Sequence, residues 1–77
     1  MHFGITMFAT DTALSPAELA QAAEARGFES LWLPEHTHIP TSRRTPAPMG
    51  EPLDEEYRRC LDPFVTMGMM TAVTERI

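Results

Sequence analysis

The stretch Glu29-Ser-Leu-Trp-Leu-Pro-Glu-His-Thr-His38 decides the fold, because a short apolar strand runs here directly into a charged turn. Its central apolar residues predict a strand over 29–33, of the kind that a parallel sheet buries on both faces. Pro34 ends the strand, since proline has no N–H to donate to a neighbouring strand. Glu35 and His36 follow at once, at the position where α/β sheets and barrels place their chemistry.

The preceding residues complete a strand–helix–strand unit. Residues 2–8 are mainly apolar and predict a first strand. Ser15 is a suitable N-cap, Pro16 suits the first helical position, and a glutamate three residues after the cap completes a capping box. Gly27 is the expected left-handed residue that ends the helix, which we place at 16–26. The pattern predicts a right-handed βαβ unit with parallel strands.

A long connection, roughly 34–61, follows the second strand and holds five of the seven prolines. Loops of this length are usually functional. Residues 54–60 predict one or two helical turns within it. Asp62 and the proline after it predict the start of a further helix over 64–74, whose almost uniformly apolar surface predicts burial. Ile77 reads as the first residue of a third strand.

This order of elements leaves both predicted strands with open edges. We therefore expect an α/β fold that is the first βαβα portion of a (β/α)8 TIM barrel, truncated before the third strand. Residues 1–77 would be the N-terminal part of one barrel domain. Within it, Trp32 is expected in the core, although it could also floor a pocket, and Cys60 is expected to be buried.

Composition limits the classes of partner. Eleven carboxylates against six arginines and no lysine give a formal charge of −5, which argues against a nucleic-acid-binding protein. One cysteine excludes an internal disulfide. The start of the chain lacks a secretory signal, and its longest apolar run, 63–73, is shorter than the ~20 residues that span a bilayer. We expect a cytoplasmic protein that acts on a small molecule, with neither nucleic acid nor membrane as partner.

His36 is the strongest catalytic candidate. An imidazole at the C-terminal end of a barrel strand can donate or accept a proton near neutral pH, or hydrogen-bond a cofactor carbonyl. The alternative is a histidine that caps a turn or bonds a backbone carbonyl. Glu35 could position a hydroxyl of the substrate or cofactor, or it could be a solvated loop carboxylate.

Two further features of the loop suggest ligand contacts. His36 and His38 could present two metal ligands, as in barrel hydrolases, but such sites need further ligands from later strands. The Arg43-Arg44 pair could clamp a phosphate or carboxylate. Alternatively, these arginines pair on the surface with acids such as Glu51. The four glycines form no phosphate-binding loop.

Several stretches resemble a known family. Residues 1–8, 15–20 and 26–36 are similar to the N-terminus of the bacterial-luciferase-like flavin and deazaflavin oxidoreductases. Residues 35–46 and Leu61-Asp-Pro-Phe64 resemble the subgroup that depends on coenzyme F420. The resemblance covers essentially the whole chain.

The resemblance implies a barrel whose C-terminal mouth holds the ring of coenzyme F420, with FMN as the alternative cofactor. Glu35 and His36 match the family's acid–histidine pair, in which the histidine lies beside the reactive ring as proton donor or charge stabiliser. Phe8 would lie near the pocket floor and complete the cofactor contacts. His38 and Arg43 are expected to contact substrate, and the full-length form is expected to be a homo-oligomer.

The sequence thus favours an oxidoreductase that performs hydride transfer or monooxygenation, with this chain as an incomplete copy. A non-catalytic remnant of such an enzyme is the second reading. A metal-dependent barrel hydrolase using His36 and His38 is the third.

Overall fold

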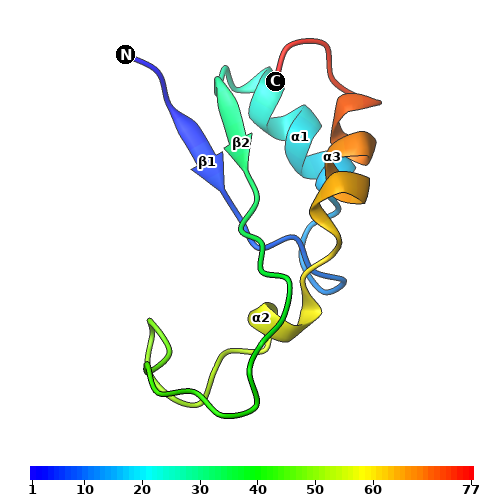
Figure 1. The fold of residues 1–77 in the computed structure, drawn as a ribbon. Coiled ribbons are helices and arrows are strands. Elements are labelled where there is room, and N and C mark those ends of the chain that lie inside the picture. Colours follow the sequence, from blue (N-terminus) through cyan, green and yellow to red (C-terminus); the bar gives the residue numbers. More distant parts are fainter.

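The computed structural model describes residues 1–77 as two strands and three helices. In chain order these are β1 (Gly4–Thr6), α1 (Pro16–Ala25), β2 (Ser30–Trp32), α2 (Glu56–Arg59) and α3 (Pro63–Thr71). The strands pair in parallel with Ile5 opposite Leu31, as expected for a βαβ unit. Figure 1 shows α1 and α3 side by side next to the sheet, while both strands run toward α2.

The signals around α1 act largely as predicted. Pro16 is the first helical residue after the Ser15 cap, but the Ser15 side chain makes no bond to the helix, so the capping box does not form. At the other end Gly27 has a φ of 80°. The backbone N–H groups of Gly27 and Phe28 donate to the carbonyls of Glu24 and Ala23 at 3.0 and 3.1 Å. This pair of bonds is a Schellman motif, which explains why the helix ends here.

The buried core is small and lies between α1 and α3. Leu19, Ala20 and Met70 form it, and Leu31 of β2 packs against it. Both strands are shorter than expected, with three residues each. The expectation of a core position for Trp32 is wrong, because its side chain is 65% exposed. Its indole Nε1 donates to the hydroxyl of Ser30 at 2.9 Å, and its ring lies beside Gly4 on an open face of the sheet.

Helix α3 begins as predicted and ends earlier. The Asp62 side chain caps it by accepting a bond from the N–H of Val65 at 2.9 Å. Only Thr66 and Met70 are buried and Phe64 is 78% exposed, so the burial that the apolar surface predicts is reached on one face, as expected for a chain that is part of a larger barrel. One face of α3 packs on α1, and its other faces lie open. The final residues form no third strand.

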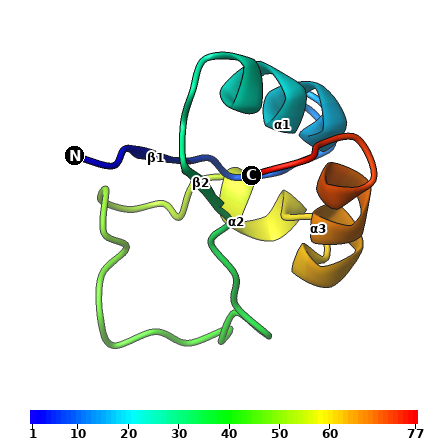
Figure 2. The same ribbon diagram turned by 90° about the horizontal axis from the view of Figure 1, so that it is seen from above.

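The connection between β2 and α2 extends away from α1 and α3, as Figure 2 shows. Ala47 and Leu53 are its buried residues, and an Arg43–Glu51 ion pair of 2.7 Å links its two sides. The predicted helical turn within 54–60 is confirmed as α2. None of the helices in this fold has the length and apolar character needed to cross a membrane.

Candidate functional site

The C-terminal ends of both strands meet at one edge of the sheet, because the strands are parallel. Phe8 follows β1 at this edge, and His36 follows β2. Helix α2 crosses beside them, since residues 10 and 60 form an antiparallel bridge between the two segments. Residues that are far apart in sequence are therefore brought together where the sequence predicted a site.

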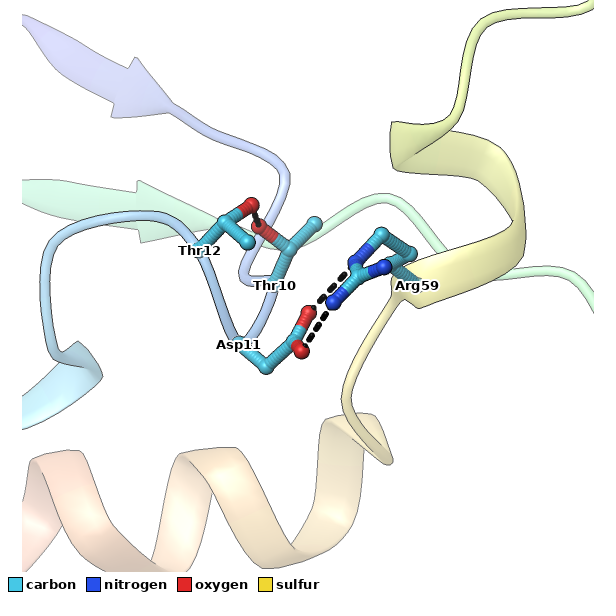
Figure 3. A network of polar contacts seen from close by, with 4 residues as sticks. All are labelled: Thr10, Asp11, Thr12 and Arg59. Atoms are coloured by element: carbon cyan, nitrogen blue, oxygen red, sulfur yellow. Dashed lines mark hydrogen bonds and ion pairs between the residues drawn. The ribbon is translucent and has the colours of Figure 1, made fainter.

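An ion pair fixes α2 to the turn after β1. The guanidinium of Arg59 donates two hydrogen bonds to the carboxylate of Asp11, one of them from Nε at 2.8 Å (Figure 3). These bonds lower the pKa of the Asp11 carboxyl and raise that of Arg59. Beside the pair, the hydroxyls of Thr10 and Thr12 lie 3.2 Å apart. The backbone N–H of Leu61 adds a bond of 2.8 Å to the carbonyl of residue 9.

His36 is half-buried and contacts α2 directly. Its Nε2 lies 2.6 Å from the backbone carbonyl oxygen of Tyr57. The Tyr57 ring in turn packs against Phe8, with ring centres 4.9 Å apart, and its centre lies 6.0 Å from that of the imidazole. Tyr57 thus lies next to both other rings, and Tyr57 and His36 line the same cavity. The carbonyl contact is the one that the sequence offered as the alternative to a catalytic role, and it does not exclude one, because the imidazole has a second nitrogen.

Two cavities of opposite character flank His36. One, of about 340 Å³, is lined by His36, Thr37, His38, Ile39, Tyr57, Arg58 and Cys60. It holds a guanidinium and two imidazoles with no carboxylate. The other, of about 410 Å³, includes Glu35 and Asp62 in its lining. His36 therefore lies between a cavity that carries the Arg58 guanidinium and one that carries two carboxylates.

The other candidate residues, Glu35, His38 and Arg43, are placed less centrally than His36. Glu35 is exposed and lines the acidic cavity. His38 is also exposed, and its Nδ1 lies 3.0 Å from the hydroxyl of Thr37. Arg43 lies in the outer loop, where its guanidinium is engaged by Glu51.

Cys60 is only partly buried, so the expected core position is not reached. Its thiol donates to the carbonyl of Glu56 at 3.1 Å, and burial raises its pKa. A raised pKa keeps more of the thiol protonated and so lowers its nucleophilicity.

Sequence reasoning missed Tyr57 and Arg58. A signal for them was present. The predicted short helix follows the long loop and carries an aromatic residue and two arginines, which are side chains that often contact ligands. What the sequence lacked was the pairing of residue 60 with the turn after β1, which brings this helix to the strand ends.

Within these 77 residues the His36–His38 pair is not joined by a third possible metal ligand. No group of three or more His, Cys, Asp or Glu side chains is placed to hold a metal ion. His36 uses Nε2 to contact a backbone carbonyl, which leaves Nδ1 as its one free ring nitrogen.

Comparison with models of known protein families identifies one matching family. The profile described as luciferase-like monooxygenase matches residues 1–77. One curated protein of Mycobacterium bovis and two of Mycobacterium tuberculosis are each 44% identical over 80 residues, and all three are named only as uncharacterized proteins. The match covers all of this chain but 28% of each relative's length. No solved structure gives a significant match. Since the family profile spans the whole chain, the chain belongs to the luciferase-like monooxygenase family.

Proposed function

We propose that residues 1–77 are the N-terminal part of a (β/α)8 barrel oxidoreductase that uses coenzyme F420, or alternatively FMN, to act on a small-molecule substrate. Members of the family are generally oxidoreductases with flavin or F420 cofactors. The observation that carries the proposal is the placement of His36, in a member of this family, at the shared C-terminal end of two parallel strands. That is where barrel enzymes of many kinds hold their substrates and cofactors.

The residues present fit a planar heterocycle with polar edges. Phe8 and Tyr57 offer aromatic surface, and His36 offers a ring nitrogen with no partner in the protein. Glu35 lines a cavity together with His36 and would hold a cofactor hydroxyl. A bound flavin or deazaflavin would supply the hydride or the electrons. His36 would donate a proton to, or hydrogen-bond, the atom on which negative charge develops.

Substrate contacts are assigned to the cavity that carries Arg58. His38 lines it, and we propose His38 as a substrate contact. Arg43 remains a proposed substrate contact, in competition with its bond to Glu51. The proposal further includes a homo-oligomeric form of the full-length enzyme.

The test is a cofactor titration of the family-length protein, by which we mean a chain of the relatives' length that contains these 77 residues. Fluorescence titration with F420 and with FMN is expected to give saturable binding of one of them. The variant His36→Ala is expected to weaken that binding, whereas His2→Ala is a matched control, because His2 pairs with Glu29 at the opposite end of the strands. Failure to bind either cofactor would favour a non-catalytic remnant.

A further inference from the structure

Contacts to the segment after β1 hold helix α2 in place. It has only four residues. The Arg59 guanidinium is bound to the Asp11 carboxylate, and the N–H of Leu61 donates to the carbonyl of Ala9 at 2.8 Å. These bonds attach the C-terminal end of α2 to the segment that leaves the first strand. The C-terminal end of α2 is therefore fixed by the segment that follows β1.

One of these contacts leaves the carbonyl of Tyr57 available. In a continuing α-helix this oxygen would accept a bond from the N–H four residues later, which belongs to Leu61. That N–H instead donates to Ala9, so the helix ends with the Tyr57 carbonyl unpaired within it. His36 meets this oxygen with Nε2 at 2.6 Å. The bond from Leu61 to Ala9 thus ends α2 and also leaves the Tyr57 carbonyl free to accept a bond from the imidazole.

The contact determines which nitrogen of His36 carries the proton. A carbonyl oxygen can only accept a hydrogen bond, so Nε2 must be the donor and must be protonated. In the neutral ring Nδ1 is then the unprotonated nitrogen, an acceptor with no partner among the residues of the chain. In the charged ring Nδ1 becomes a second donor. The ring is also steadied by Tyr57, whose side chain is packed against Phe8.

We infer that Tyr57 is a positioning residue for His36, holding its ring in the Nε2–H form so that Nδ1 is the atom that meets the ligand. The chemistry required of the ligand follows from this assignment. A ligand group beside neutral His36 must donate to Nδ1, and a group that develops negative charge must accept the Nδ1 proton of the imidazolium. The identity of the ligand rests on the proposed function, but the form of the ring does not.

The form of the ring is tested by nuclear magnetic resonance on the family-length protein, labelled with ¹⁵N-histidine and without added cofactor. At a pH where the ring is neutral, the His36 resonances are expected to show a protonated Nε2 and an unprotonated Nδ1. The variant Tyr57→Ala, which removes the packing on Phe8, is expected to give a mixture of both forms. Tyr57→Phe is expected to restore the single form, because its ring keeps that packing. A proton on Nδ1 in the wild-type protein would overturn the inference.

Kinetics provide the second readout. Tyr57→Ala is expected to lower kcat by at least about fivefold with a smaller change in KM, as for a misplaced proton-transfer group, and Tyr57→Phe is expected to recover the loss. If Tyr57→Ala fails to fold, Arg59→Gln replaces it, because that change loosens α2 without touching the three rings. An Nε2–H form and a kcat that both remain unaltered when α2 is loosened would contradict the positioning role. An Nε2–H form of His36 in a wild-type protein that binds neither F420 nor FMN would instead contradict the proposed function alone.

Discussion

Glu24 and Arg76 bind each other reciprocally through side chain and backbone. The Glu24 carboxylate accepts a bond of 2.7 Å from the backbone N–H of Arg76, and the Arg76 guanidinium donates to the backbone carbonyls of Glu24 and Phe28. The N–H groups of the two neighbouring residues, Glu75 and Ile77, also donate to this carboxylate. The segment after α3 is thereby attached to the C-terminal end of α1.

Glu24→Gln is expected to destabilise the chain at pH 7. The stability of the variant should then fall less than that of the wild type as the pH is lowered. Hydrogen bonds from the N–H groups of Ile77, Arg76 and Glu75 lower the pKa of the Glu24 carboxyl. A lowered carboxyl pKa contributes stability that is fully present above the unfolded value of about 4.3 and is lost as pH falls through the folded value. Thermal denaturation between pH 7 and pH 3, followed by circular dichroism, measures the effect.

The matched control is Glu75→Gln. Glu75 lies in the same segment, but its exposed side chain makes no hydrogen bond or ion pair within the chain, and its backbone N–H is unaffected by the substitution. The control should keep the wild-type pH dependence. Equal effects of the two substitutions would show that general charge, not the amide contacts, sets the acid sensitivity.

The same substitution at two glycines is expected to have opposite effects. Gly68 lies within α3, and the space beside it is open, so Gly68→Ala should raise the free energy of unfolding by up to about 1 kcal/mol. Gly27 has a φ of 80° in the Schellman motif, and Gly27→Ala should lower the free energy of unfolding by about 1–2 kcal/mol. Urea denaturation of both variants measures the difference. A stabilising Gly27→Ala would mean that α1 ends differently in solution.

The elements that the sequence predicts well are those with local signals. Helix α1 is bounded by Pro16 and Gly27, and the signals at both ends lie within a few residues of it. The strands were predicted too long, because pairing depends on neighbours in space, and the sheet has only two strands. The same reason explains the exposed Trp32, since an apolar run specifies that a strand prefers burial but not whether a second layer covers it.

In the candidate site, too, the sequence predicts what depends on local signals and misses what depends on long-range contacts. His36 was predicted from its place after β2, and its location at the strand ends is confirmed. Its partner Tyr57 lies 21 residues away and is reached only because Cys60 pairs with Thr10. No local pattern encodes a contact of that kind. The roles proposed for Glu35, His36 and the other site residues stay predictions until the variants are measured.

The isolated 77-residue chain is expected to be marginally stable or to self-associate. Phe64 and Val65 on α3 are 78% and 66% exposed, and the sheet has open edges. Sedimentation velocity and a thermal melt measure both properties, and Phe64→Ser should reduce association with little loss of stability, since this side chain buries little. A cooperative transition of a monomer above roughly 60 °C would contradict the expectation.

In the family-length protein, His36→Ala is expected to lower kcat by at least about tenfold, and a full general acid or base role would be worth about 10²–10⁴-fold. His38→Ala should have a much smaller effect on kcat, because His38 is exposed and bonded to a neighbouring hydroxyl instead of to α2. Steady-state kinetics with reduced cofactor measure both, and circular dichroism confirms that the fold is kept. A rise in KM with unchanged kcat would assign His36 to ligand binding alone. Wild-type kcat in both variants would contradict the placement of the chemistry at His36.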